Sequence, residues 1–252
     1  MSVPRFHCPL PLAVGACLSL PERVAHHAIK VLRLRSGSVL TLFNGEGGEF
    51  GARISTIDGP RVSVEILDWR AVERESPLSI TLIQALQAGE KMDLTVQKAV
   101  ELGVARIVPT LSRRSVVRLD ASRAARRADH WRGVIIAACE QCGRNRLPTV
   151  SDPVSLEDWL TQSPSSAALR LVLAPTASQS LNALSPPLEG CVEVLIGAEG
   201  GLAPEEIRLA ESVGFRPIRF GPRVLRSETA GMAALAAIQF FWGDLSEEKT
   251  DV

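Results

Sequence analysis

The chain lacks several features that mark membrane, secreted and metal-binding proteins. Its 252 residues contain no run of 18 or more apolar residues, so no transmembrane helix is expected. The apolar stretch at the N-terminus is interrupted by Pro9, Pro11 and Gly15 and is preceded only by Arg5, which disfavours a secretory signal. Five cysteines, an odd number in a long chain, argue for reduced thiols. These absences predict a cytoplasmic protein.

Two of the cysteines, Cys139 and Cys142, form a CxxC pair. A structural zinc site needs four ligands, and no second pair is spaced to supply the other two. A redox CxxC should follow a strand, whereas the segment GVIIAACEQCGR is typical of a helix. We therefore expect two thiols on a helix face and no metal.

Lysine is scarce and net charge is absent, because 28 basic residues balance 28 acidic ones. The distribution is uneven, however. Residues 106–146 contain ten arginines against three acids, and residues 5–35 contain five basic residues against one acid. Two basic segments in a neutral chain favour a surface for phosphate groups. Charge alone leaves a solvated helix surface equally open.

The first part of the chain has the pattern of a small β-barrel domain. SVLTLFN, ARISTI and RVSVEIL alternate apolar and polar residues, as antiparallel strands do. The segment PERVAHHAIKVLR predicts a short helix before them, and WRAVERESP is a charged linker. We predict a first domain at residues 1–72 and a second at residues 77–245.

After Pro77 the pattern changes to alternating strands and helices, which predicts a largely parallel α/β sheet. The last helix, ETAGMAALAAIQFFW, is apolar almost all round and must therefore be buried on every face. In a domain of this size, that predicts core contacts on one side and a second subunit on the other.

Two glycine-containing loops follow predicted strands and carry the candidate chemistry. In LIGAEGGLAPEE, a strand runs into Gly197, Gly200 and Gly201, where backbone without side chains can approach a ligand closely. The segment lacks the GK[ST] ending of a phosphate-binding P-loop and is not GxGxxG. In GPRVLRSETAGMAALAAIQ, a second strand ends at Gly221 before the apolar helix. Each segment alone remains compatible with an ordinary strand-to-helix turn.

Together with other segments, these loops resemble the 16S ribosomal RNA uridine N3-methyltransferases of the SPOUT superfamily. The likeness runs through PRFH, HHAIKVLRLRSG, QALQAGEKMDLTVQKAVELGVARIVP, RSVVRLD, ACEQCGR, IGAEGG and GPRVLRSETA, in the order of that family. The combination is highly specific although each motif alone is weak. Three departures are Ala198, Cys142 and Ser227, where the family usually has proline, serine and threonine. Losing the proline leaves the loop less preset, so we expect at most weaker cofactor binding.

The resemblance implies a C-terminal SPOUT domain with a deep trefoil knot, a small N-terminal PUA-like β-barrel that grips RNA, and a homodimer. It implies S-adenosylmethionine as cofactor and 16S rRNA, within the small ribosomal subunit, as partner. The expected cofactor-binding residues are Leu173, Ala174, Pro175, Ile196, Gly197, Glu199, Gly200, Gly201, Gly221, Leu225, Ser227, Thr229 and Ala230.

Methylation of uridine N3 also requires loss of a proton, so a base or donors that stabilise charge on O2 and O4 must exist. Arg226 is the first candidate for stabilising that charge, and Glu199 or Glu228 for the base. Loop and capping roles for the two glutamates remain open. Residues expected to contact RNA phosphate, from the basic segments and the family motifs, are Arg5, Arg33, Arg114, Arg144 and Arg146.

Two other functions stay open. A SPOUT enzyme could instead methylate a ribose 2′-hydroxyl, although the N-terminal motifs match the uridine-N3 family. A non-catalytic RNA-binding assembly factor could also keep this fold, although the retained glycine loops and Arg226 argue against it.

Overall fold

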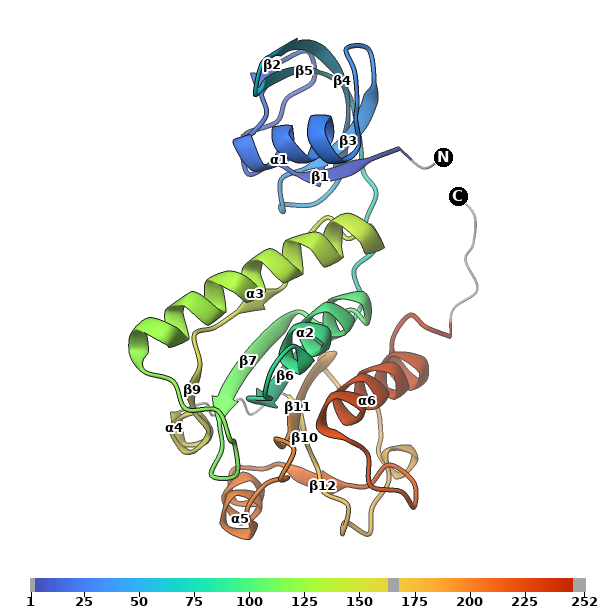
Figure 1. Cartoon of the computed structure of the whole chain (residues 1–252). Helices are drawn as coiled ribbons and strands as arrows, with labels where there is room; N and C mark the ends of the chain where they lie inside the picture. The colour runs from blue at the N-terminus through green and yellow to red at the C-terminus, as the bar shows by residue number, and fades with distance from the viewer. Residues whose placement is uncertain (1–2, 163–167, 247–252) are drawn as a thin grey trace. The chain divides into compact units, whose positions relative to one another are not determined.

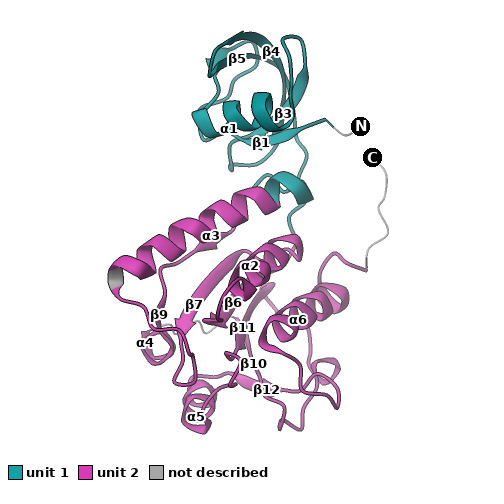
Figure 2. Ribbon diagram, viewed as in Figure 1, with its two compact units in different colours: residues 1–75, 139–147 teal, residues 76–138, 148–252 magenta. Residues whose placement is uncertain are grey.

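The computed structural model describes residues 3–162 and 168–246 and divides into two compact units (Figure 1, Figure 2). Unit 1 comprises residues 1–75 together with 139–147, and unit 2 comprises residues 76–138 and 148–252. Residues 139–147 lie within the second domain that the sequence predicts at residues 77–245, and the structure groups them with unit 1. Their membership of unit 1 is a tertiary effect, because the partners that hold them lie more than 60 residues away in the chain.

Unit 1 is built on a curled five-stranded sheet. Its elements are β1 (Arg5–His7), β2 (Cys17–Ser19), α1 (Glu22–His26), η1 (His27–Val31), β3 (Val39–Phe43), β4 (Glu49–Asp58) and β5 (Arg61–Arg70). The strand order is β1-β3-β4-β5-β2, with β1 parallel to β3 and the other neighbours antiparallel. The strands and the short helix predicted from the sequence are confirmed. The helix is α-helical only to His26, and its second half is a π-helix.

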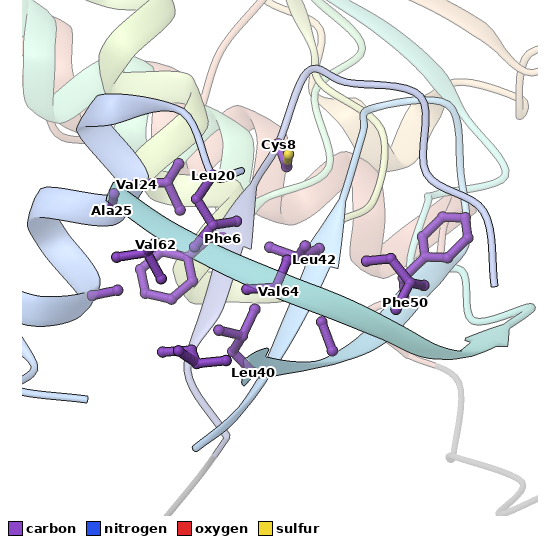
Figure 3. Close-up of a cluster of buried hydrophobic side chains, with 14 residues drawn as sticks. Phe6, Cys8, Leu20, Val24, Ala25, Leu40, Leu42, Phe50, Val62 and Val64 are labelled. Carbon is purple, nitrogen blue, oxygen red and sulfur yellow. The ribbon is translucent and has the colours of Figure 1, made fainter. Parts of the chain in front are cut away.

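The core of unit 1 follows from the alternation along these strands (Figure 3). Alternate residues of β5, including Val62 and Val64, are buried, and their neighbours face outward. They pack against Phe6 of β1, and Leu40 and Leu42 of β3 belong to the same cluster. Burial of large apolar side chains contributes roughly 1.5–3 kcal/mol each. The apolar pattern therefore determines which face of the sheet turns inward.

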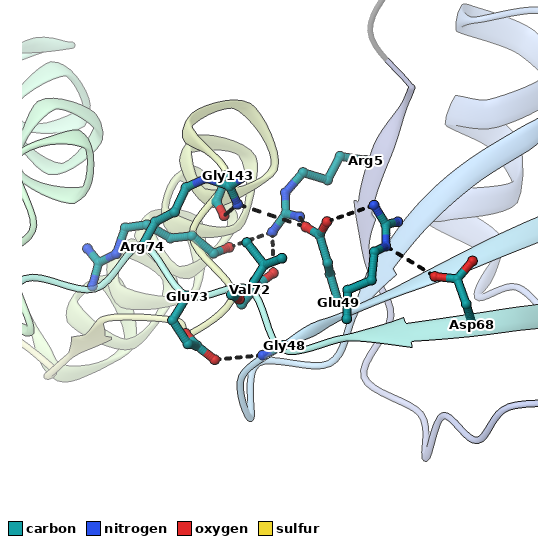
Figure 4. Close-up of polar contacts among 11 residues, drawn as sticks. Arg5, Gly48, Glu49, Asp68, Val72, Glu73, Arg74 and Gly143 are labelled. Atoms are coloured by element: carbon teal, nitrogen blue, oxygen red, sulfur yellow. Dashed lines mark hydrogen bonds and ion pairs between the residues drawn. The ribbon is translucent and has the colours of Figure 1, made fainter. Parts of the chain in front are cut away.

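Polar contacts attach residues 139–147 to the sheet of unit 1 (Figure 4). Arg5 donates to Glu49 at 2.5 Å, to the carbonyl of Arg144 at 2.8 Å and to the side chain of Asn145 at 2.6 Å. Arg144 in turn forms an ion pair with Glu75. We call this set of contacts, made by Arg5, Glu49, Glu75, Arg144 and Asn145, the seam.

Unit 2 is an α/β domain with an all-parallel sheet. Its elements are β6 (Ser79–Ala85), α2 (Lys91–Glu101), β7 (Arg106–Leu111), α3 (Ala121–Cys142), β8 (Thr149–Val150), β9 (Val154–Ser155), α4 (Leu156–Gln162), β10 (Leu169–Leu173), η2 (Leu181–Ala183), β11 (Cys191–Ile196), α5 (Pro204–Ser212), β12 (Arg216–Ile218) and α6 (Ser227–Trp242). The last residues of α3 belong to unit 1. The strand order is β12-β10-β11-β6-β7-β8, with β9 also paired to β7. The predicted parallel α/β sheet is confirmed.

Helices cover both faces of this sheet, because successive strand residues point to opposite sides. Ile83 of β6 and Leu195 of β11 pack with α4 and α5 in one buried cluster. The alternate residues Gln84 and Ile196 lie beneath α6, next to Gly231. Helix α2 packs beside α6 (Figure 1). Strands covered on both faces are rich in apolar residues, and in SITLIQA and CVEVLI the buried polar exceptions are Gln84 and Glu193.

Helix α6 is buried on one face only within a single chain. Gly231, Ala234, Leu235 and Ile238 are buried. The other face holds the half-buried residues Met232, Ala233, Ala236 and Ala237 and the exposed rings of Phe240 and Phe241. The core contact expected from the sequence is therefore present. The remaining apolar face is open to solvent in the single chain.

Each helix in the described part of the chain is too short or too polar to span a membrane.

Candidate functional site

A cavity of about 390 Å³ lies in unit 2 where three neighbouring strands end. Its walls come from the carboxyl ends of β10, β11 and β12, the loops that follow them, and the first turn of α6. In open α/β sheets, ligands bind outside the carboxyl ends of strands, where the strand order reverses. The cavity occupies such a place, because the chain passes inward from β10 to its neighbour β11 and then crosses outward to β12 on the other side of β10.

The structure gathers most of the sequence-predicted cofactor residues around this cavity. The lining contains Leu173, Ala174, Pro175, Ile196, Gly197, Glu199, Gly200, Gly201, Leu225, Ser227 and Ala230. Gly221 and Thr229 are exposed and do not line it. Arg223 and Val224, within the cofactor loop expected at residues 221–230, also line the cavity, whereas Arg219 and Phe220 line it from just before that loop. Arg114, predicted to contact RNA, also lines the cavity.

The β11–α5 loop uses glycine where side chains would collide. A Cβ on Gly197 would lie 2.8 Å from the carbonyl carbon of Gly201. Gly201 closes the tight turn by donating its N–H to Ala198 at 2.8 Å, with a φ of 71° that favours glycine. Ala198 fits this turn without proline and is buried. Backbone rather than side chain therefore forms this wall of the cavity.

A buried hydrogen-bond network anchors the start of α6 to the cavity wall. The Ser227 hydroxyl donates to the carbonyl of Gly197 at 2.5 Å and accepts from Gln84 Nε2 and Gln87 Nε2 at 3.0 Å each. Thr95 of α2 donates to Gln87 Oε1 at 2.9 Å. Sequence reasoning missed the two glutamines and Thr95. The available signal was a pair of amides within the apolar segment LIQALQ.

Glu199, a candidate base, is held by the loop that follows β6. Its carboxylate accepts from the N–H of Ala88 at 3.1 Å and pairs with Lys91 Nζ at 3.2 Å. Burial raises the pKa of Glu199, but hydrogen bonds from its own N–H and that of Ala88, with the Lys91 charge, outweigh burial and leave the pKa below its ordinary value. The group is therefore ionised at neutral pH and serves as an acceptor or a negative charge at the cavity.

The other two catalytic candidates lie beside the cavity, outside its lining. Arg226 is the N-cap residue of α6 and its side chain is exposed. It lies between Leu225 and Ser227, which both line the cavity. Glu228 is half-buried, and its Oε2 is buried without a hydrogen-bond partner among the described residues. The Arg226 side chain is therefore open to a molecule that binds across the first turn of α6, and Glu228 keeps a carboxylate oxygen without a donor among the described residues.

The five arginines predicted to contact RNA have different surroundings. Arg5 and Arg144 belong to the seam, and their side chains are 12% and 6% exposed. This burial does not support their predicted phosphate contact, because both guanidinium groups bind acidic and carbonyl partners of unit 1. Arg33 is exposed with a left-handed φ of 55°, and Arg146 is mainly exposed near Glu73. Arg114 is exposed and donates to the carbonyl of Gly200 at 3.0 Å.

The CxxC pair lies at the end of α3, as the sequence indicates. Cys139 is buried, and burial raises the pKa of its thiol to about 12. A thiol is reactive or metal-binding as the thiolate, so this environment opposes both roles at neutral pH. Among the residues that the structure describes, no cluster of histidine, cysteine or acidic side chains could hold a metal ion.

Comparisons with known proteins agree with this architecture. The model of the RNA methyltransferase domain matches residues 74–239, and that of the RNA methyltransferase PUA domain matches residues 20–67. A putative methyltransferase from Legionella pneumophila, solved with bound SAM, is 40% identical, with a TM-score of 0.92 over 97% of this chain and 100% of the other.

Proteins named ribosomal RNA small subunit methyltransferase E are also similar. The one from Neisseria gonorrhoeae, solved bound to S-adenosyl methionine, is 39% identical, with a TM-score of 0.90 over 97% of this chain and 100% of the other. The one from Buchnera aphidicola (Schizaphis graminum) is 35% identical over 97% of this chain and 98% of its own length. The chain therefore belongs to the RNA methyltransferase family and carries that family's PUA domain in unit 1.

Proposed function

We propose that this protein transfers the methyl group of S-adenosylmethionine to N3 of a specific uridine in 16S ribosomal RNA. The observation that carries the proposal is the cavity at the ends of β10, β11 and β12. It lies in a chain that resembles, over nearly its full length, two methyltransferases solved with this cofactor.

The residues around the cavity fit the chemical parts of the cofactor. Apolar side chains suited to a planar base come from Ile196, Leu202, Ile218 and Leu225. Arg114, Arg219 and Arg223 supply positive charge for the carboxylate of the methionine part, and Glu199 supplies negative charge for its ammonium group. The volume of about 390 Å³ falls in the range of small-molecule sites.

When bound, S-adenosylmethionine supplies an electrophilic methyl group on a positively charged sulfur. The chain's own contribution is chiefly alignment of the acceptor with that methyl, which is an effect of proximity and orientation. The Ser227 network fixes the start of α6 against the β11–α5 loop, because the Ser227 hydroxyl, in the first turn of α6, bonds to Gly197 of the loop and to Gln84 of β6. Because this wall is already ordered before the cofactor binds, less conformational entropy is lost on binding.

The two candidate bases, Glu199 and Glu228, differ in their hydrogen-bond partners. Glu199 is engaged by Ala88 and Lys91 and has a lowered pKa, so it is a weak base. Glu228 keeps one buried oxygen without a donor among the described residues. We therefore assign proton acceptance from N3 to Glu228 and charge stabilisation on O2 or O4 to Arg226, whose side chain is exposed beside it.

The acceptor atom also restricts the form of the substrate. N3 lies on the pairing edge of uridine, so the target must be unpaired or drawn out of its pair before it reaches the cavity. The proposal includes the PUA domain as an RNA grip, the trefoil knot in unit 2, a homodimer and action on small ribosomal subunits in the cytoplasm.

Nucleoside mass spectrometry tests the proposal directly. The pure protein is incubated with S-adenosylmethionine and small ribosomal subunits that lack the modification. We expect 3-methyluridine to appear in 16S rRNA. A 2′-O-methylated nucleoside instead would keep the methyltransferase assignment and overturn the N3 assignment. No product on subunits, free rRNA or tRNA would overturn catalysis and favour the assembly-factor alternative.

A further inference from the structure

A second hollow in unit 2 is lined mainly by arginine. It has a volume of about 420 Å³ and lies at the β7–α3 connection and the first turns of α3. Its lining residues are Val117, Arg118, Leu119, Arg123, Arg126 and Arg127. We call it the arginine cleft. None of these residues belongs to the cavity described above or to the arginines expected from the sequence to contact RNA.

The positive charge of the arginine cleft is largely uncompensated. Arg123 pairs with Asp120 at 3.4 Å, and Arg126 donates to the carbonyl and hydroxyl of Ser122, its neighbour one turn away, at 3.4 Å each. Within residues 3–162 and 168–246, Arg118 and Arg127 make no ion pair. Residues 113–127 contain six arginines and one aspartate, so the segment carries a formal charge of +5. Clustered like charges repel one another, so an anionic partner is favoured there.

The N-terminus of α3 does not by itself explain anion binding at the arginine cleft. Asp120 already accepts the N–H of Arg123 at 2.8 Å, so the first turn of α3 has an internal cap. The attraction for an anion therefore comes from the guanidinium groups. Their planar, forked donors match phosphate oxygens, and Val117 and Leu119 complete the lining of the arginine cleft.

The same connection reaches the cofactor cavity. Arg113 N–H donates to Glu206 Oε1 at 2.8 Å, and Arg114 donates to Gly200 at 3.0 Å. These bonds attach the connection to the β11–α5 loop, through Gly200, and to the first turn of α5, through Glu206. Arg118 follows Arg114 by four residues, so their Cα atoms are at most about 14 Å apart. An RNA strand that places one nucleotide in the cavity can therefore place the phosphate of a neighbouring nucleotide in the arginine cleft.

We propose that the arginine cleft binds the sugar–phosphate backbone of the RNA substrate beside the target nucleotide. The inference rests on the proposed function for the identity of the ligand, because it takes RNA as the substrate. It adds a binding surface within unit 2, distinct from the PUA domain. Phosphate contacts position a nucleic acid without reading its sequence. The arginine cleft therefore acts on affinity and orientation, whereas the cavity performs the chemistry.

The test compares the double variant Arg118→Ala/Arg127→Ala with a matched control, Arg132→Ala. Arg132 lies on the same helix outside the arginine cleft and is paired with Asp129 and Asp152. Binding to small-subunit rRNA is measured by fluorescence anisotropy at several KCl concentrations. We expect the log–log salt slope of the double variant to fall by about two, one for each phosphate contact removed. We expect at least a tenfold loss of affinity at low salt.

Further measurements distinguish a failure of this inference from a failure of the proposed function. Calorimetry should show unchanged S-adenosylmethionine binding, and Arg118→Lys/Arg127→Lys should restore most of the affinity. Unchanged RNA affinity and slope in the alanine variant, with 3-methyluridine still formed, would overturn the arginine cleft and leave the function intact. A wild type that binds RNA through these arginines but forms no methylated nucleoside would overturn the function and support the arginine cleft. An affinity loss equal to that of Arg132→Ala would also contradict the inference.

Discussion

At the scale of single residues, the hydroxyl of Ser227 joins three parts of unit 2. It binds the carbonyl of Gly197 and two glutamine amides, and Gln87 Nε2 has no other partner among the described residues. Replacing serine with alanine removes the hydroxyl that serves all three groups. Because buried polar groups cost free energy when they lose their partner, one residue here affects both stability and the shape of the cavity.

We predict that Ser227→Ala lowers the free energy of unfolding by about 1–3 kcal/mol, the cost of leaving a buried donor unpaired. It should also weaken S-adenosylmethionine binding. Urea unfolding and calorimetry measure the two effects. Ser227→Thr is the matched control, because it keeps the hydroxyl and restores the residue usual in the resembling family. Equal stability and affinity in all three proteins would contradict the role assigned to the network.

Arg226 tests the assignment of charge stabilisation. Its side chain is exposed at the N-cap of α6, so truncation should leave the fold unchanged. We predict that Arg226→Ala lowers turnover at least 100-fold, on the order of the 2.7–4 kcal/mol lost with an oxyanion donor. Steady-state methylation assays give the rate, and light scattering checks that the oligomer persists. Near-normal turnover would remove Arg226 from the site.

Cys139 provides a prediction on pH. Burial raises the pKa of its thiol to about 12, above the ordinary 9.0, so the folded state favours the neutral thiol. The resulting contribution to stability is complete below about pH 9 and is lost as pH rises toward 12. We expect wild type to lose more urea resistance between pH 8.5 and 10.5 than Cys139→Ala. In native protein at pH 7.5, iodoacetamide should label exposed Cys17 and spare Cys139. Rapid labelling of Cys139 would contradict its burial.

At the scale of elements, the seam explains why a segment between α3 and β8 belongs to unit 1. Arg144 is nearly buried and pairs with Glu75, while its carbonyl accepts from Arg5. Buried ion pairs contribute little compared with apolar packing, but removing one partner leaves a charge without compensation. The seam therefore holds residues 139–147 strongly only while all its members are present.

We predict that Arg144→Ala lowers the free energy of unfolding by about 3–5 kcal/mol, because Glu75 loses its buried partner. The matched control is Arg146→Ala, whose side chain is 57% exposed and 3.8 Å from Glu73. It should cost about 0–1 kcal/mol. Urea unfolding measures both, and the double variant Glu75→Ala/Arg144→Ala should cost less than the sum of its singles. Equal costs for Arg144 and Arg146 would contradict the seam.

At the scale of the whole molecule, the exposed apolar face of α6 supports the proposed homodimer. Phe240 and Phe241 are 57% and 53% exposed, and half-buried alanines continue the same apolar surface. We predict a particle of twice the 27.1 kDa chain mass at micromolar concentration. Phe240→Glu should shift it toward the monomer, because a charge cannot be buried unpaired in an apolar contact. Sedimentation measures the mass.

The control for this prediction is Leu188→Glu, at an apolar position that is fully exposed in unit 2 outside α6. It should leave the mass unchanged. A monomeric wild type, or equal effects of the two variants, would overturn the proposed use of the α6 face.

The sequence by itself determined the order and type of most elements. Period-two and period-3.6 patterns predicted the strands of unit 1 and the alternating strands and helices of unit 2, because burial of one face is a local property of sequence. The glycine loops also indicated where the cavity walls would lie, since strand ends in a parallel sheet meet at one edge.

Only the tertiary structure decided which polar residues meet. Gln84, Gln87 and Thr95 support Ser227 from more than 130 residues away in the chain, and Arg5 and Arg144 bind inside unit 1 although their charge favoured the surface. The arginine cleft likewise depends on how the β7–α3 connection folds back on its helix. The physical reason is that apolar burial follows local periodicity, whereas a hydrogen bond or ion pair depends on distances that only the assembled fold sets.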